Sequence, residues 1–143
     1  MRRISIPIAW FARLAVGFVF IVNVECAMAF ILHPEKYIAG FEVGGVAGKV
    51  IVQSLGILFL MWNTTYPLVI LRPQAHTTLF FIIICQQAIG VVGETWLWLA
   101  LPAGHAALAA TGLRFIVFDG LGLLLMGLAF GLLRWAKRPK TSR

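Results

Sequence analysis

Charged residues are scarce in this chain of 143 residues: they make up only 12% of it, while 61% of its residues are hydrophobic. An average soluble domain carries about 25% charged residues. A small soluble domain could not bury so much apolar side chain, because folding leaves roughly a third of the surface of the unfolded chain exposed. The same composition excludes intrinsic disorder. We therefore predict that a lipid bilayer surrounds the fold.

Cysteine is also scarce, and Cys26 and Cys85 lie in separate apolar stretches. Two cysteines so far apart make neither a disulfide scaffold nor a Cys-x-x-Cys metal set. The sequence shows no nucleophile beside a base, no phosphate-cradling loop and no nucleotide fingerprint. We predict no catalytic residue and no metal site, and the sequence favours a non-catalytic protein over an enzyme.

Acidic residues are few, since 5 Asp and Glu stand against 12 Lys and Arg, for a net charge of +7. Such an excess in a soluble protein would suggest nucleic acid binding. Here the basic residues flank apolar stretches, which is typical of membrane orientation and not of a phosphate-binding face. Lipids, and not nucleic acid, are the expected partners of Arg2, Arg3, Arg72, Arg134, Lys137, Arg138, Lys140 and Arg143.

Four apolar stretches are long enough to cross a membrane as helices, which takes about 20 residues. Each is continuous and not alternating, so helices are favoured over strands. The sequence predicts an all-α fold in which residues 1–143 form one integral membrane four-helix bundle with up-down-up-down topology. The predicted spans are about 8–32, 46–71, 78–101 and 112–133.

The distribution of Lys and Arg also predicts orientation. With four crossings, both ends of the chain and the turn at Arg72 fall on the side that is rich in Lys and Arg. Because such segments stay in the cytoplasm, we expect a multi-pass protein of a bacterial plasma membrane with cytoplasmic N and C termini.

Ionisable residues inside membrane spans are costly and mark candidate functional sites. Counting along the spans places three acids, two bases and one glutamine in the outward half of the bundle. Antiparallel helices bring residues of equal depth together, so we predict one buried polar cluster formed by Glu25, Lys49, Gln53, Glu94, Arg114 and Asp119. Interhelical hydrogen bonds account for the deeper residues Asn23, Gln86 and Gln87.

Two interpretations of this cluster remain open. In the favoured one, Glu25 pairs with Lys49, and Glu94 or Asp119 pairs with Arg114, so that ion pairs between helices fix their register. In the other, the cluster binds a lipid headgroup, a quinone or a proton from the outer face. The three histidines lie at the ends of spans, and no two share a mid-membrane depth that would suit haem ligation.

Glycines with a spacing of four residues are typical of close helix contacts in membranes. Gly44 and Gly48 show this spacing at the entry to the second span, and Gly127 and Gly131 show it in the fourth, where Gly120 and Gly122 precede them. We predict that these glycines pack helices closely, either within the bundle or against another subunit.

The first half of the chain resembles the DoxX-like family of small four-helix membrane proteins. The resemblance rests on Arg13, Gly17 and Phe20 in the Arg-x-x-x-Gly-x-x-Phe pattern, on residues 33–37 (HPEKY) and on residues 48–60 (GKVIVQSLGILFL). The chain departs from that family where Ala27 replaces a lysine and Gln53 replaces an acid. The resemblance implies a four-helix fold and an association with quinone-linked electron transfer.

Two functions follow as expectations. The favoured one is a non-catalytic accessory subunit that stabilises a larger membrane complex, most readily a respiratory or photosynthetic electron-transfer complex. The alternative is a DoxX-like quinone-linked redox protein or a small transporter that uses the polar cluster. No cofactor is predicted, and quinone and lipid are the candidate ligands.

Overall fold

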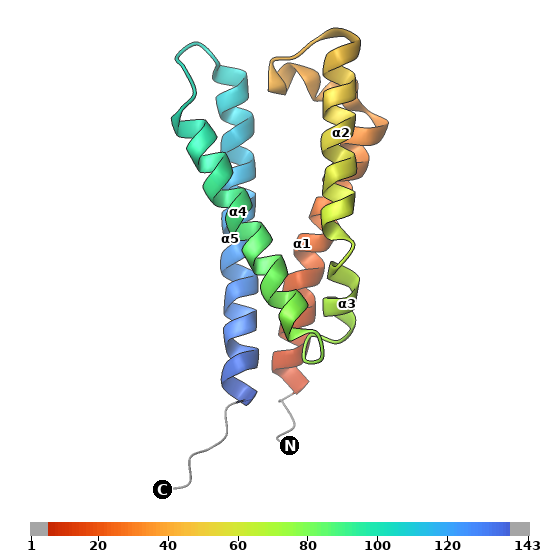
Figure 1. Cartoon of the computed structure of the whole chain (residues 1–143), viewed down its shortest axis with the longest axis vertical. Helices are drawn as coiled ribbons and strands as arrows, with labels where there is room; N and C mark the ends of the chain where they lie inside the picture. The colour runs from red at the N-terminus through yellow and green to blue at the C-terminus, as the bar shows by residue number, and fades with distance from the viewer. Residues whose placement is uncertain (1–5, 138–143) are drawn as a thin grey trace, which may run out of the picture.

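The structure is a computed structural model that describes residues 6–137 (Figure 1). These residues form helices and loops, and no strand is present among them. The elements in chain order are α1 (Ile6–Leu32), η1 (Pro34–Lys36), η2 (Ile38–Phe41), α2 (Gly45–Asn63), α3 (Tyr66–Leu71), α4 (Thr77–Leu99) and α5 (Ala106–Lys137), η1 and η2 being short 3-10 helices.

Four segments are long and apolar enough to cross a membrane: Ile6–Leu32, Gly45–Leu71, Thr77–Ala100 and Ala106–Lys137. They confirm the predicted all-α four-helix fold. The start of α1 and the end of α5 lie at the same end of the bundle, as an up-down-up-down chain requires (Figure 1). Residues 1–5 and 138–143, which include Arg2, Arg3, Arg138, Lys140 and Arg143, lie outside the described residues, so which side they face stays a prediction.

The helices pack as two hairpins. α1 packs against α2 and α4 packs against α5, while α1 and α5 form the main contact between the hairpins. α3 adds contacts to α1 and α4 at the end where the chain starts and finishes. α2 and α4 are not packed against each other within the described residues.

The second span is interrupted, whereas the sequence predicted one continuous helix. α2 ends at Asn63, and α3 begins at Tyr66 with Pro67 in its first turn, where the missing N–H of proline is tolerated. Side chains donate to carbonyl groups of the last turn of α2, since Asn63 Nδ2 lies 2.8 Å from Phe59 O and Thr64 Oγ1 lies 2.9 Å from Met61 O. In a membrane, such a break is stable only where these groups are satisfied.

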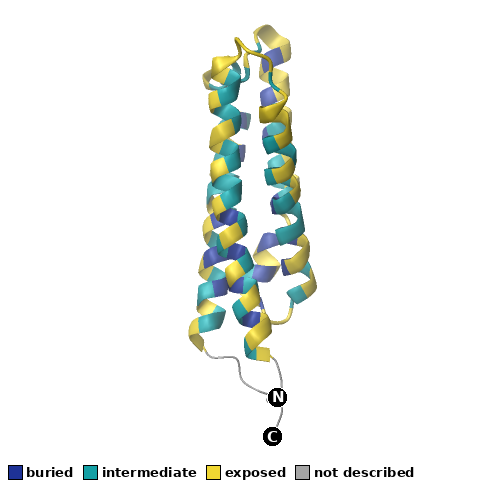
Figure 2. Ribbon diagram, turned by 90° about the vertical axis from the view of Figure 1, so that its left-hand side faces the viewer, coloured by how far each residue is buried: buried dark blue, intermediate teal, exposed yellow. Residues whose placement is uncertain are grey.

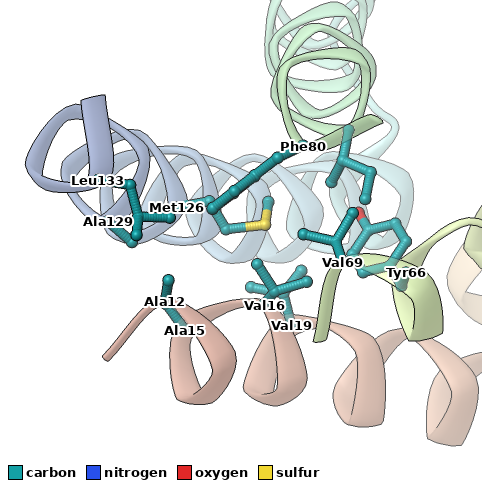
Figure 3. Close-up of a cluster of buried hydrophobic side chains, with 11 residues drawn as sticks. Ala12, Ala15, Val16, Val19, Tyr66, Val69, Phe80, Met126, Ala129 and Leu133 are labelled. Carbon is teal, nitrogen blue, oxygen red and sulfur yellow. The ribbon is translucent and has the colours of Figure 1, made fainter. Parts of the chain in front are cut away.

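The apolar core fills the half of the bundle that contains α3 (Figure 3). Side chains from α1, α3, α4 and α5 meet there, among them Val16, Tyr66, Phe80 and Met126, each fully buried. Exposed residues run along the outward faces of the helices (Figure 2), and many of them are large and apolar. The chain therefore presents apolar surface outward over its length, as contact with lipid requires.

Close helix contacts occur at Gly56 and Gly122, neither of which has another glycine four residues away. A Cβ atom on Gly56 would lie 2.7 Å from Ala27 O, so α1 and α2 could not approach as they do with any larger residue. A Cβ atom on Gly122 would lie 3.2 Å from Gln87 Nε2, between α4 and α5. The four-residue spacing identifies glycines on one helix face, but not which face meets a neighbour.

The other predicted packing glycines differ from these two. The positions where a Cβ atom would stand on Gly44, Gly120, Gly127 and Gly131 have no neighbouring side chain or element within 4 Å, and the three atoms nearest to a Cβ atom on the buried Gly48 all belong to Val43. Close contacts within the bundle, one of the two alternatives from the sequence, are therefore not made by Gly44, Gly120, Gly127 and Gly131. Packing against another subunit stays a prediction.

Candidate functional site

A cavity of about 550 Å³ occupies the half of the bundle opposite to the apolar core. Its walls come from α1, α2, α4 and α5, and from the segment 34–42, which we call the cap. Ligand pockets in proteins typically measure about 300–1,000 Å³. The cavity is therefore large enough for a small organic molecule, and we call it the central cavity.

Aromatic side chains form much of its wall. The ring centroid of Phe30 on α1 lies 6.0 Å from that of Phe59 on α2 and 6.3 Å from that of Phe115 on α5. Phe41 of the cap lies 6.2 Å from Phe115. These distances fall in the range of about 4.5–7 Å at which aromatic rings attract one another. Further aromatic rings that line the cavity are Tyr37, Trp62 and Phe118.

Polar groups gather at the deep end of the cavity, where Gln87 of α4 meets Asp119 of α5. Gln87 Nε2 donates a hydrogen bond of 2.7 Å to Asp119 Oδ1 and lies 3.3 Å from the Asp119 carbonyl oxygen. Tyr66 Oη donates a longer bond of 3.5 Å to Gln87 Oε1. A Cβ atom on Gly90 would lie 2.8 Å from Asp119 Oδ2, so glycine at this position leaves room for the carboxylate.

Two asparagines border the same end of the cavity. Asn23 Nδ2 donates to Asn63 Oδ1 over 3.4 Å, and Asn63 Nδ2 in turn bonds Phe59 O. The interhelical bonds expected of Asn23 and Gln87 are thus present. Asn63 was not among the predicted site residues, and its position beside the break between α2 and α3 could not be read from an apolar stretch.

Glu94 and Arg114 also line the cavity, but they do not form the predicted ion pair. Glu94 Oε2 is buried and has no hydrogen-bond partner, while the Arg114 side chain is exposed. Among the described residues, the only ion pairs within 4.0 Å join His33 to Glu35 and His105 to Glu42. The pairing of Arg114 with Glu94 or Asp119 was therefore wrong.

The pairing of Glu25 with Lys49 was wrong as well. Gln53 Nε2 donates a 3.1 Å hydrogen bond to Ile31 O, and this contact fixes the register of α2 against α1. Lys49 lies one turn beyond it toward the cap, whereas Glu25 lies six residues below Ile31, and both side chains are exposed. Counting along the spans estimates depth only coarsely, and it does not indicate which way a side chain faces.

Of the predicted cluster, the structure brings Glu94, Arg114 and Asp119 to the central cavity. Glu25, Lys49 and Gln53 do not line it. Residues that the cluster missed include Lys36 in the cap, whose contribution depends on how the cap folds over the helix ends.

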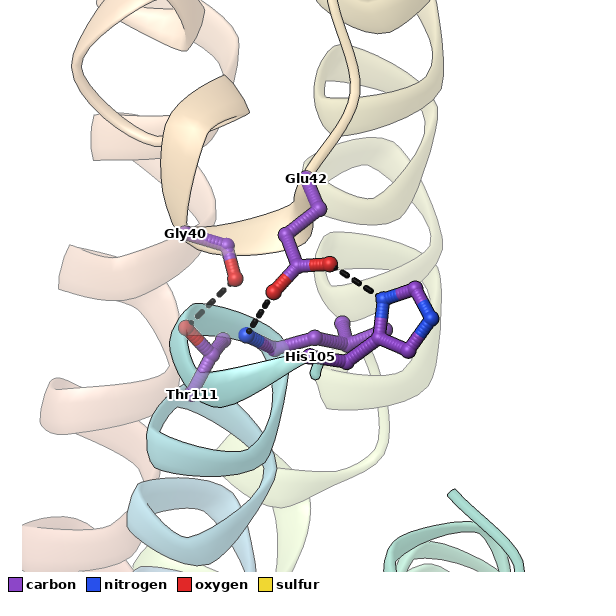
Figure 4. Close-up of polar contacts among 5 residues, drawn as sticks. Gly40, Glu42, His105 and Thr111 are labelled. Atoms are coloured by element: carbon purple, nitrogen blue, oxygen red, sulfur yellow. Dashed lines mark hydrogen bonds and ion pairs between the residues drawn. The ribbon is translucent and has the colours of Figure 1, made fainter. Parts of the chain in front are cut away.

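The cap is fastened to the start of α5 (Figure 4). Glu42 accepts hydrogen bonds from His105 Nδ1 at 2.5 Å and from the Leu108 amide at 3.1 Å. Thr111 Oγ1 donates a 2.8 Å bond to Gly40 O. The bonds from His105 and Leu108 stabilise the charged carboxylate and hold the pKa of Glu42 below its usual range. These contacts hold the cap across the end of the cavity, and no local motif predicts bonds between residues so far apart in the chain.

The described residues contain no group of three or more His, Cys, Asp or Glu side chains that could hold a metal ion. Comparison with known proteins finds no matching family model, no matching curated protein and no matching solved structure. The function must therefore be inferred from the geometry of the cavity, and the resemblance to the DoxX-like family stays a prediction.

Proposed function

We propose that this protein binds a small amphipathic molecule of the bilayer in the central cavity. The proposal is supported by one observation above all: a volume of about 550 Å³ is lined by aromatic rings along its walls and by Asp119, Gln87 and Glu94 on its polar side. Binding sites for small molecules combine apolar walls with a few converging polar groups in this way. This function corresponds to the redox or transport alternative from the sequence.

The proposal is tested by filling the cavity. Val22 lines it, whereas the adjacent Ile21 faces outward and is 63% exposed. We expect Val22→Trp to displace the bound molecule and Ile21→Trp to leave it in place. Both variants and the unmodified protein are purified in mild detergent, and their bound small molecules are extracted and measured by mass spectrometry. If all three retain the same molecules in the same amounts, the cavity is not the binding site.

A second candidate function is the accessory subunit of a larger membrane complex, as the sequence favoured. Glu25 supports it, because this residue is exposed on α1 seven residues before the helix ends. A charged side chain facing lipid at the centre of a span costs about 2.5–3.5 kcal/mol, and a neighbouring subunit would remove that contact. An electron-transfer complex as the host rests on the DoxX-like resemblance alone.

Native gel electrophoresis after mild-detergent extraction tests this second function. We expect a band larger than the isolated chain, with partner subunits that mass spectrometry identifies. Glu25→Leu should weaken the assembly if a polar group of the partner covers Glu25, whereas Leu14→Ala, further along the exposed face of the same helix, is the matched control. Migration as the isolated chain under the mildest extraction would contradict an accessory role.

A further inference from the structure

We propose that the ligand of the central cavity is a lipophilic cation, an amine or a quaternary ammonium compound, whose charged group lies against Asp119 and Glu94 while its apolar part contacts the aromatic wall. This inference rests on the proposed binding function and names the chemical class of the ligand.

The balance of hydrogen-bond donors and acceptors in the cavity favours a cationic ligand. Each side-chain amide group named above donates at least one hydrogen bond within the protein: Asn23 to Asn63, Asn63 to Phe59 O, and Gln87 to Asp119. The carboxylates, in contrast, keep free acceptor positions. Gln87, the amide that contacts Asp119, directs its Nε2 donors to the carboxylate and the backbone carbonyl of Asp119, so a quinone carbonyl finds no free donor there, whereas a cation or an N–H donor finds acceptors on the two acids.

The acids of the cavity lack a cationic partner in the part of the chain that the structure describes. No Lys, Arg or His side chain of the described residues forms an ion pair with Asp119 or Glu94 within 4.0 Å, and Glu94 Oε2 is buried without any partner. A buried carboxylate is costly unless it is paired or hydrogen-bonded. Because the protein itself does not supply the partner, a cation from the ligand would compensate these acids.

The two bases of the cavity are placed differently from the two acids. Lys36 in the cap and Arg114 on α5 have exposed side chains, whereas Asp119 and Glu94 are partly buried. Asp119 lies five residues beyond Arg114 along α5, a rise of about 7.5 Å at 1.5 Å per residue. The four formal charges sum to zero, but both negative charges belong to partly buried side chains and both positive charges to exposed ones.

The aromatic wall of the cavity also favours a cation. The faces of Trp, Tyr and Phe rings attract cations within about 6 Å, and this attraction is strongest when water is excluded. Trp62 and Phe118 line the cavity together with the Phe30 cluster described above. A cation in this cavity would have both carboxylates and aromatic rings in the surrounding wall, and a neutral molecule of the same shape would gain from neither in this way.

Three probes of one shape test the inference: benzyltrimethylammonium, its neutral carbon analogue neopentylbenzene and the anion phenylmethanesulfonate. Binding is measured at pH 7 by isothermal titration to the full chain in lipid nanodiscs, with empty nanodiscs as the blank. We expect the cation to bind at least about tenfold more tightly than the other two probes, as expected when a charged group is paired rather than left unpaired.

The variants locate the binding. Asp119→Asn keeps an oxygen for the Gln87 bond and removes the charge, and we expect it to weaken binding of the cation about tenfold. Glu94→Gln provides a second test if Asp119→Asn fails to fold. Glu25→Gln removes an exposed acid outside the cavity and should leave binding unchanged.

The outcomes separate this inference from the proposed function. Equal binding of the cation and the neutral probe, lost in Val22→Trp, would overturn the cationic class and support a ligand cavity. Tighter binding of the anion would likewise overturn it. If the cation binds more tightly than the others, and Asp119→Asn or Glu94→Gln removes that difference, the inference holds. If no probe binds and Val22→Trp changes no bound molecule, both proposals fail.

Discussion

Gln87 Nε2 lies 2.7 Å from Asp119 Oδ1, and this hydrogen bond joins α4 to α5 at the polar end of the central cavity. Two glycines make the contact possible. Gly90 leaves space beside Asp119 Oδ2, and Gly122 leaves space beside Gln87 Nε2. The bond therefore depends on small residues from both helices as well as on the two partners.

Gln87→Leu should destabilise the bundle, because it removes the donor for Asp119. Losing the partner of a buried polar group costs about 1–3 kcal/mol. The adjacent Gln86 is the matched control, since its Oε1 atom is buried without a hydrogen-bond partner and Gln86→Leu should retain or raise stability. Unfolding in SDS, followed by circular dichroism, measures both. Equal losses in the two variants would show that the Gln87–Asp119 bond contributes nothing of its own.

Gly56→Ala should also destabilise the protein, because its Cβ atom would lie 2.7 Å from Ala27 O and push α1 from α2. Overpacking of this kind costs about 1–3 kcal/mol. Gly127→Ala meets no neighbour within 4 Å and should leave stability equal or raise it by up to about 1 kcal/mol, since glycine is a poor helix former. A thermal unfolding series on both variants checks this. A tolerated Gly56→Ala would contradict the close α1–α2 contact.

The attachment of the cap to α5 should weaken in acid. The pKa of Glu42 is lowered because His105 and the Leu108 amide donate hydrogen bonds to its charged form. A carboxyl group whose pKa is lowered by folding stabilises the folded state when the pH is above the ordinary pKa of about 4.3. This stabilisation is lost as the pH falls through the pKa of the folded state.

The measurement is the hydrogen-exchange protection of the Leu108 amide as the pH is lowered from about 6 to about 3. We expect protection to fall with pH in the unmodified protein, and to be low at every pH in Glu42→Gln. Glu35→Gln changes a cap acid that pairs with His33 and not with α5, so it should follow the unmodified protein. A pH-independent protection factor in the unmodified protein would refute the attachment.

Reporter fusions test the orientation of the chain. The excess of Lys and Arg at both ends predicts that a fusion at Arg3 and a fusion at Arg143 both report the cytoplasm. Both positions lie outside the described residues. An activity on the far side of the membrane for either fusion would contradict the proposed orientation, and the same result for both fusions would place the cap on the cytoplasmic side.

Much of the fold could be predicted because a membrane span needs only length and apolarity. The predicted span 8–32 matches Ile6–Leu32, and 78–101 matches Thr77–Ala100 within one residue at each end. The break at Asn63 was not predicted, because its stability depends on a side chain that turns back to a backbone carbonyl. Hydropathy does not record such a bond.

The site was harder to predict. Depth along a span can be counted from the sequence, and it correctly grouped Glu94, Arg114 and Asp119 around one cavity. The direction in which a side chain points cannot be inferred when its helix is apolar on all sides, because no polar stripe then distinguishes one face from another. Glu25 and Lys49 were therefore assigned to the interior although both are exposed.

The division into two hairpins has a consequence for biosynthesis. α1 and α2 supply Phe30, Trp62 and Asn63 to the central cavity, while α4 and α5 supply Glu94 and Asp119. Both of these acids follow the first hairpin in the chain, so the ribosome synthesises the aromatic part of the wall before either of them. The cavity exists only once the last helix has inserted, and a chain stopped before α5 would carry aromatic residues for a site that has no Asp119.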